Sequence, residues 1–228
     1  MNIYWTAYAE FDTISTFDFL QPNKLELNFS KDPSKSFTIC PAYQDQIRNT
    51  YELKFPNTYN ILLDKNISSP DYDQKYFDEM VNIRSIDDKL FSYNLRYLFY
   101  TDQPLEISMT PAYLTVNEFT QNTTLVPGKF DIGQWFRPLD CSFIMNSNQL
   151  QLKKDDTFAY IKFHTDKKIN LINFYRSQNI IRLQNDLFKT RLYKPHKIKP
   201  MSYFYQLYNK IKFKKIIDKE VKLNIIKN

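Results

Sequence analysis

Short stretches of alternating apolar and polar residues run through the first three quarters of this chain, and turn-forming residues separate them. Alternation with a two-residue period is typical of half-buried strands, which end at Pro, Asn, Asp and Ser clusters. The predicted strands cover residues 2–9, 25–29, 37–40, 51–55, 59–63, 90–101, 105–114, 129–132, 139–146, 150–154 and 157–165. A short helix is predicted at 42–50, residues 75–88 fit helix or strand, and residues 116–127 are predicted to form a polar loop. Such a series predicts a mainly β fold, an antiparallel sandwich or a jelly-roll-like domain.

The pattern changes towards the C-terminus. Apolar residues in 172–193 follow an imperfect helical stripe, and Ser202 is placed to cap a second helix whose apolar positions continue to Val221. We therefore predict a β domain over residues 1–170 and a basic helical extension over 171–228. The extension packs on the domain or projects from it.

Composition supports a folded core. The chain has 17 Tyr and 19 Phe, and aromatic residues, which favour strands, make up 17% of it. Cys40 and Cys141 lack metal-site spacing and are predicted to be reduced core thiols. The first residues resemble no signal peptide, and no apolar run approaches the roughly 18 residues that span a bilayer. The sequence thus predicts a soluble, intracellular protein.

Charge is distributed unevenly. Residues 189–228 carry twelve Lys or Arg and two acidic residues, a net +10, whereas the chain totals +6. Residues 1–188 therefore carry −4, and the basic character belongs to the C-terminal part. Aromatic residues alternate with lysines there, so a basic interaction face is predicted at Lys210, Lys212, Lys214 and Lys215. A docked helix with solvated lysines, a protein partner, a nucleic acid and an anionic membrane all fit this pattern.

Both glycines of the chain, Gly128 and Gly133, lie within six residues, although about sixteen would be average for this length. We expect a left-handed backbone or a close approach at each. They flank a strand that leads to a predicted ligand-binding rim of the sheet. The candidate rim residues are Asp131, Trp135, Arg137 and Tyr113. In the alternative interpretation, Trp135 closes the end of the sandwich and Arg137 pairs with Asp131 or Asp140.

The two histidines allow one metal hypothesis. His164 and Asp166 have the His-x-Asp form of a two-His-one-carboxylate iron site, and His196 is the candidate third ligand. The competing interpretation is a strand-end histidine and a surface histidine. The sequence contains no nucleophile elbow and no glycine-rich phosphate loop, so it offers no other established catalytic motif.

Several segments resemble an uncharacterised family of proteins from marine tailed phages, itself distantly similar to a bacterial domain of unknown function. The segments are LFYTDQPLEISMTPAYL, PGKFDIGQWFRPLDCSFIMN, LKKDDTFAYIKFHTDKKI and KPMSYFYQLYNKIKFKK. The resemblance implies a phage-encoded protein that acts in the cytoplasm of an infected bacterium, or one associated with the virion. It implies no catalytic residues.

A second likeness is to the trimeric dUTPase and dCTP-deaminase fold. The order Gly128, Asp131, Trp135, Arg137 and Asn146, followed by an apolar strand, is similar to that fold. The likeness implies a shared strand–turn–strand shape, but Asp155 stands where the fold has a glycine, and nucleotide hydrolysis is not implied.

These observations favour a phage accessory protein whose β domain binds a small ligand or a protein partner. One alternative is an enzyme acting on a small molecule or nucleotide, either an iron-dependent oxygenase or a dUTPase-like protein. Another alternative is a structural component of the virion. The sequence is also compatible with a homo-oligomer and with nucleic-acid binding through the basic C-terminal part.

Overall fold

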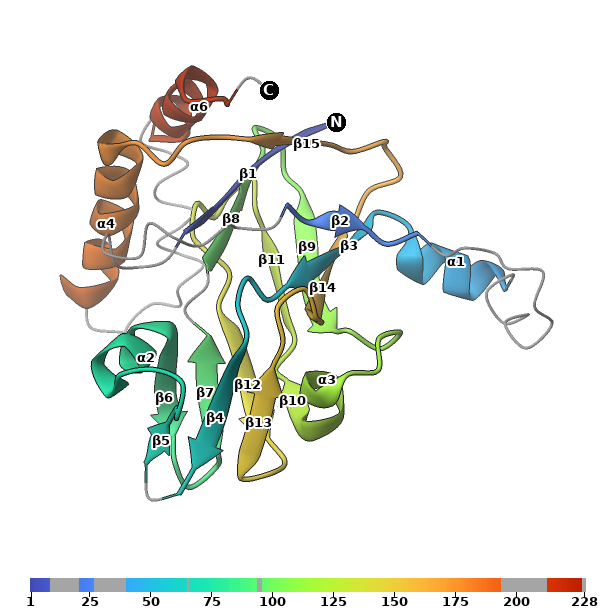
Figure 1. Cartoon of the computed structure of the whole chain (residues 1–228). Helices are drawn as coiled ribbons and strands as arrows, with labels where there is room; N and C mark the ends of the chain where they lie inside the picture. The colour runs from blue at the N-terminus through green and yellow to red at the C-terminus, as the bar shows by residue number, and fades with distance from the viewer. Residues whose placement is uncertain (9–20, 27–39, 65, 94–95, 194–212, 227–228) are drawn as a thin grey trace.

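The computed structural model describes residues 1–8, 21–26, 40–64, 66–93, 96–193 and 213–226. Within these residues the strands form four sheets, ordered β15-β1-β8, β10-β12-β7-β6, β11-β9-β14-β3-β2 and β13-β4-β5 (Figure 1). The strands are β1 (Asn2–Tyr8), β2 (Asn23–Lys24), β3 (Thr50–Lys54), β4 (Tyr59–Leu63), β5 (Ile67–Ser68), β6 (Val81–Ser85), β7 (Leu90–Tyr93), β8 (Arg96–Tyr100), β9 (Glu106–Pro111), β10 (Thr123–Leu125), β11 (Gly128–Asp131), β12 (Cys141–Met145), β13 (Gln149–Leu152), β14 (Thr157–Phe163) and β15 (Asn170–Asn173). Neighbouring strands are antiparallel, apart from the parallel pair β1 and β15. The prediction of a mainly β, antiparallel, sandwich-like fold is confirmed.

Helices lie at the periphery of the sheets (Figure 1). They are α1 (Pro41–Ile47), α2 (Gln74–Met80), α3 (Glu118–Asn122), α4 (Gln178–Tyr193) and α6 (Phe213–Leu223). The short helix predicted at 42–50 is confirmed as α1, and the ambiguous segment 75–88 divides into α2 and β6. None of the described helices is long and apolar enough to cross a membrane.

Aromatic side chains fill the main core, as the composition predicts. Phe55 stacks on Phe158 with ring centroids 4.7 Å apart, and Phe119 meets Phe55 edge to face at 5.1 Å. Phe119 also contacts Phe143 at 5.1 Å. Edge-to-face and offset pairs are the favoured geometries of aromatic rings, and each contributes beyond the apolar area it buries. Phe158 lies in β14, Phe143 in β12 and Phe119 in α3, while Phe55 follows β3, so these rings join two of the sheets.

A second core cluster lies beneath α6. Ile217 and Val221, one helical turn apart, are buried against Tyr4 of β1, Tyr100 of β8 and Phe174. Figure 1 shows α4 and α6 together beside the end of β1 and β15. This part of the predicted basic extension therefore packs on the β domain.

The predicted strand 90–101 is wrong as a single element. The structure places β7 and β8 in different sheets, where β7 pairs with β6 and β12 while β8 pairs with β1. Both strands are strongly apolar, so the sequence pattern continues across the point where the chain passes from one sheet to another.

The predicted polar loop 116–127 is also wrong, because it contains α3 and β10. Asn117 caps α3 by accepting a hydrogen bond from the Thr120 N–H at 2.8 Å, and Thr120 Oγ1 accepts from the Asn117 N–H at 3.0 Å. This reciprocal pair satisfies two amides that a helix start otherwise leaves unpaired. Phe119 then fixes the short helix to the core.

The predicted helix over 172–193 begins later than expected. Its first residues form the end of β15, which runs parallel to β1 with Asn173 opposite Trp5, and α4 starts at Gln178. Phe174, which we expected on the helix, is instead fully buried in the cluster beneath α6.

Three smaller predictions are corrected and others lie outside the described residues. The strand predicted at 25–29 is not found in its described part, because β2 covers Asn23–Lys24 and Leu25 and Glu26 belong to no strand. Cys141 is buried as predicted, but Cys40 is exposed. Gly128 has neither a left-handed backbone nor a close neighbour. Residues 27–29, 37–39, Ser202 and the apolar positions 204–211 lie outside the described part of the chain.

Candidate functional site

Asp131 organises a turn at the end of β11. Its Oδ1 accepts hydrogen bonds from the N–H groups of Leu105 at 2.9 Å and Gly133 at 2.8 Å, and its Oδ2 accepts from the Gln134 side chain at 2.8 Å. Both carboxylate oxygens are therefore occupied by the turn itself. In the structure Asp131 thus holds the turn together, and a ligand-binding role for it stays a prediction.

Gly133 is required by the same turn. A Cβ at this position would lie 1.9 Å from the carbonyl oxygen of Gln103, so only glycine lets the two backbones approach. The expectation of a close approach is confirmed at Gly133. It is wrong for Gly128, where a Cβ would meet nothing within 4 Å.

After this turn, Trp135 and Phe136 face different surroundings. The Trp135 ring lies parallel to Phe130 of β11, with centroids 5.8 Å apart and an interplanar angle of 9°. Phe136 instead enters the cluster beneath α6, where it meets Tyr100 edge to face at 5.6 Å. Trp135 is only partly buried, so its stack with Phe130 leaves aromatic surface in contact with solvent.

Arg137 is partly buried, and its guanidinium has no hydrogen bond or ion pair with the residues that the structure describes. The partners suggested by the sequence are engaged elsewhere. Asp140 pairs with Arg84 at 3.0 Å, and Asp131 holds its turn. The interpretation in which Arg137 pairs with Asp131 or Asp140 is therefore wrong.

Tyr113 does not belong to this rim. Asp131 pairs with Glu106 at the start of β9, whereas Tyr113 follows Pro111 at the other end. At about 3.4 Å per residue, the strand alone separates the two ends by about 17 Å. Tyr113 is 49% exposed and meets Tyr160 edge to face at 5.1 Å.

A cleft of about 250 Å³ adjoins Tyr113. Val116 stands at its edge and is 81% exposed, while Phe119 and Phe158 are among its buried lining residues. Its threonine hydroxyls already have partners, as Thr120 donates to the Thr115 carbonyl at 2.9 Å and Thr123 donates to the Phe119 carbonyl at 2.7 Å. The cleft therefore presents mainly apolar surface.

His164 meets Ser108, a residue that the sequence analysis did not identify. Ser108 Oγ and His164 Nε2 are 2.6 Å apart on the outer face of the five-stranded sheet. Partial burial lowers the pKa of His164, and the nearby charges of Lys129 and Lys162 lower it further, which favours a neutral imidazole at pH 7. Alternation in β9 and β14 places these residues on one face, but only the pairing of the two strands brings Ser108 to His164.

This Ser–His contact has the form of the nucleophile and base of a catalytic triad. The third group of a triad is an acceptor that orients the other ring nitrogen, and none is found for His164 Nδ1 in the described ranges. Within those ranges the contact is therefore a polar pair on the sheet surface.

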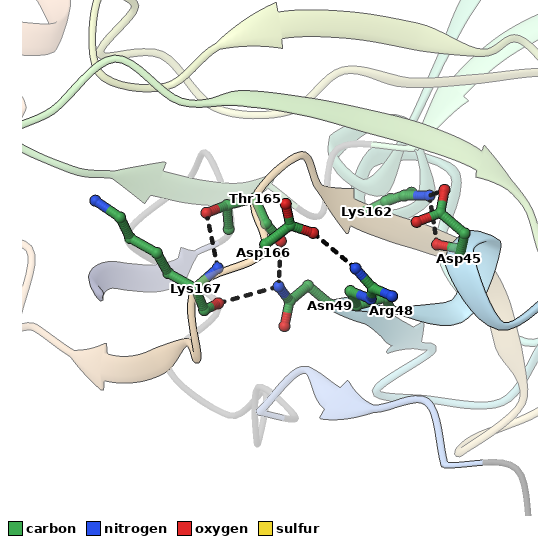
Figure 2. A network of polar contacts seen from close by, with 7 residues as sticks. All are labelled: Asp45, Arg48, Asn49, Lys162, Thr165, Asp166 and Lys167. Carbon is green, nitrogen blue, oxygen red and sulfur yellow. Dashed lines mark hydrogen bonds and ion pairs between the residues drawn. The ribbon is translucent and has the colours of Figure 1, made fainter.

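Asp166 takes part in a polar network with Arg48, on the segment that Asn49 also contacts (Figure 2). Its carboxylate pairs with Arg48 at 2.7 Å, while Asn49 donates to the carbonyls of Thr165 at 2.5 Å and Lys167 at 3.1 Å. The described residues contain no group of three or more His, Cys, Asp or Glu that could hold a metal. His196, the third predicted iron ligand, lies outside them.

Of the predicted basic interaction face, Lys214 and Lys215 lie in the first turn of α6. Lys210 and Lys212 fall outside the described residues. Lys215 is exposed, and Lys214 is partly exposed. Further along the helix, Lys222 pairs with Asp218 at 2.8 Å and lies 3.8 Å from Asp102.

In comparisons with known proteins, no family model matches this chain, and no curated protein matches it. The resemblances to a marine phage family and to the dUTPase fold therefore stay predictions.

Proposed function

We propose that this chain is a phage accessory protein of the infected bacterial cytoplasm whose β domain binds a planar anionic ligand. The ligand contacts the Trp135 surface, which we define as Phe130, Trp135 and Arg137. The observation that carries the proposal is that Arg137 is a partly buried residue whose guanidinium has no hydrogen bond or ion pair with the described residues. A bound carboxylate or phosphate would give this guanidinium a charge-assisted partner.

The aromatic pair next to Arg137 supports a planar ligand. Phe130 covers one side of the Trp135 ring, so the indole is held in a fixed orientation. An aromatic ring or base stacks on such a platform with little loss of side-chain freedom. Arginine two residues further along can form a bidentate contact with an acidic group on the same ligand. Nucleoside monophosphates combine both features and are suitable probes.

Intrinsic fluorescence gives a direct test, because the chain has only two tryptophans. Trp5 is 3% exposed, whereas Trp135 is partly exposed, so a Trp5→Phe variant reports on the proposed site alone. We expect saturable quenching by at least one ribo- or deoxyribonucleoside monophosphate. In this background, Arg137→Gln should weaken binding about tenfold or more, because it removes a charge-assisted contact of about 1.5–3 kcal/mol.

Arg84→Gln is the matched control, because it removes an arginine whose partner is Asp140 and which lies outside the Trp135 surface. Its affinity for the probe should equal that of the parent protein. Equal affinities for Arg84→Gln and Arg137→Gln would refute the role of Arg137. Absence of quenching with every monophosphate would refute the proposed ligand class.

A further inference from the structure

The outward side of α6 combines exposed aliphatic residues with lysines. Ile216 is 49% exposed and Leu223 is 69% exposed, and their spacing of seven residues places them on one side of the helix. Lys215 and Lys219, four residues apart, border this strip. The opposite side of the helix is accounted for, because Ile217 and Val221 are buried against the β domain.

The apolar strip continues onto the C-terminal residues. Phe174 and Ile225 form an antiparallel bridge, and the Tyr175 N–H donates to the Asn224 carbonyl at 2.8 Å. Since Phe174 points into the core, alternation turns Tyr175 outward, where it is 66% exposed. Ile226 follows the bridge residue Ile225, so the same alternation turns it outward, and it is 44% exposed. We define the α6 outer face by these residues: Lys215, Ile216, Lys219, Leu223, Tyr175 and Ile226.

The acidic residues of α6 do not neutralise this face. Asp218 is bound by Lys222 at 2.8 Å, and Glu220 accepts a hydrogen bond from Asn179 of α4 at 3.3 Å. Lys215 and Lys219 make no ion pair with the residues described here. The α6 outer face is therefore cationic as well as apolar, and a second copy of the chain would meet it with the same charge.

We propose that the α6 outer face docks on an anionic lipid surface. Lysines next to an aliphatic strip are the combination by which a peripheral helix binds lipid, because the ammonium groups meet acidic headgroups while the aliphatic groups enter the interface. Tyr175 adds an amphipathic aromatic ring of the kind that favours headgroup depth. Figure 1 places α6 at the edge of the molecule, so its outer face can approach a membrane without a change in fold. Nucleic acid would match the lysines but would leave Ile216 and Leu223 exposed to water.

The test is co-sedimentation of the purified full chain with lipid vesicles. Vesicles with about one third phosphatidylglycerol in phosphatidylcholine supply the anionic surface, and phosphatidylcholine alone is the reference. We expect binding at least about tenfold stronger to the anionic vesicles. Raising the salt from about 0.1 M to about 1 M, which shortens the Debye length from about 10 Å to about 3 Å, should largely release the protein.

Variants locate the contact. Leu223→Asp and, separately, Lys215→Glu with Lys219→Glu should each reduce vesicle binding about tenfold or more. Val116→Asp is the matched control, because Val116 is 81% exposed and precedes α3 at the other end of the molecule (Figure 1). It should bind vesicles like the parent protein, and thermal melting confirms that each variant is folded.

Three results would overturn the proposal. The first is no preference of the parent chain for anionic vesicles. The second is an equal effect of Leu223→Asp and Val116→Asp. The third is binding to a fluorescent single-stranded oligonucleotide, abolished by the lysine changes, without any binding to vesicles. That result would assign the lysines to nucleic acid.

Discussion

The carbonyl oxygen of Gln103 occupies the space that a side chain at Gly133 would need. A Cβ built on Gly133 would lie 1.9 Å from this oxygen and 2.6 Å from the carbonyl carbon, both of them backbone atoms that cannot rotate away. We expect Gly133→Ala to lower the free energy of unfolding by about 3 kcal/mol or more, or to prevent folding. Urea denaturation followed by circular dichroism measures the change.

Gly128 provides the control for this prediction. A Cβ there would meet nothing within 4 Å, and its backbone is not left-handed. Gly128→Ala should therefore be neutral or stabilising by up to about 1 kcal/mol, because alanine restricts the unfolded chain. Similar losses in both variants would show that the close approach at Gly133 does not determine the effect.

Asn49 joins β3 to the segment that follows β14, and we expect its replacement to be costly. It has a φ of 53°, is 7% exposed, and donates to the carbonyls of Thr165 and Lys167. Asn49→Ala should cost about 3 kcal/mol, from two lost hydrogen bonds and a left-handed backbone that alanine disfavours. Asn49→Gly keeps the backbone conformation accessible and should cost about 1 kcal/mol less. Thermal denaturation of both variants tests this order, and an equal loss would contradict the backbone contribution.

The neighbouring ion pair should behave differently. Arg48 and Asp166 are 2.7 Å apart, but their side chains are 54% and 89% exposed. Exposed pairs contribute little because water screens both charges, so Asp166→Asn should cost less than about 1 kcal/mol. A loss as large as that of Asn49→Ala would mean that the network in Figure 2 acts as one unit.

The sequence was most informative where structure is local. The segment 59–63 is a short, mostly apolar run, and turn-forming residues precede it, so β4 is predicted with both of its ends. Asn117 and Thr120 also carry a local signal, a capping box, but α3 has one buried side chain and thus shows no apolar periodicity. In residues 117–122 the capping box predicts the helix, whereas the polar composition of the segment wrongly predicts a loop.

Contacts between distant strands could not be predicted in this way. Alternation places Ser108 and His164 on polar faces of their strands, but their contact depends on β9 pairing with β14 in one particular register. The same limit applies to Asp131 and Tyr113, which were predicted to share one rim. In the structure Asp131 pairs with the first residue of β9, whereas Tyr113 follows its last residue. Trp135 and Arg137 remain together because only one residue separates them.

The hydroxyl of Tyr100 is buried and has no hydrogen-bond partner among the described residues. Burial and the nearby carboxylates of Asp218 and Asp102 raise the pKa of this phenol, so it stays protonated. Tyr100→Phe removes an unsatisfied polar group and should be neutral or stabilising by about 1 kcal/mol.

Tyr160→Phe is the matched comparison for Tyr100→Phe. Its hydroxyl is also buried but lies 2.9 Å from Thr115 Oγ1, so its removal should cost about 1 kcal/mol. Chemical denaturation of both variants measures the two effects. A loss of stability in Tyr100→Phe equal to that in Tyr160→Phe would show that the Tyr100 hydroxyl has a partner.

His164 should make stability depend on pH in the weakly acidic range. Its pKa is lowered from 6.5 in the fold, chiefly by partial burial and then by Lys129 and Lys162, while Glu106 and Asp45 oppose the shift. The unfolded chain therefore binds a proton at a higher pH than the folded chain does. Stability is fully present above pH 6.5 and falls as the pH drops through that value towards the lowered pKa.

Melting temperatures of the parent protein and His164→Gln between about pH 8 and about pH 5.5 test this prediction, because carboxylates titrate mainly below that range. The parent should lose stability on acidification, and His164→Gln should show a smaller slope. His196→Gln, which removes the other histidine, should keep the slope of the parent. Because burial and the two lysines all disfavour the imidazolium, an unchanged slope in His164→Gln would mean that acid sensitivity arises away from the outer face of the five-stranded sheet.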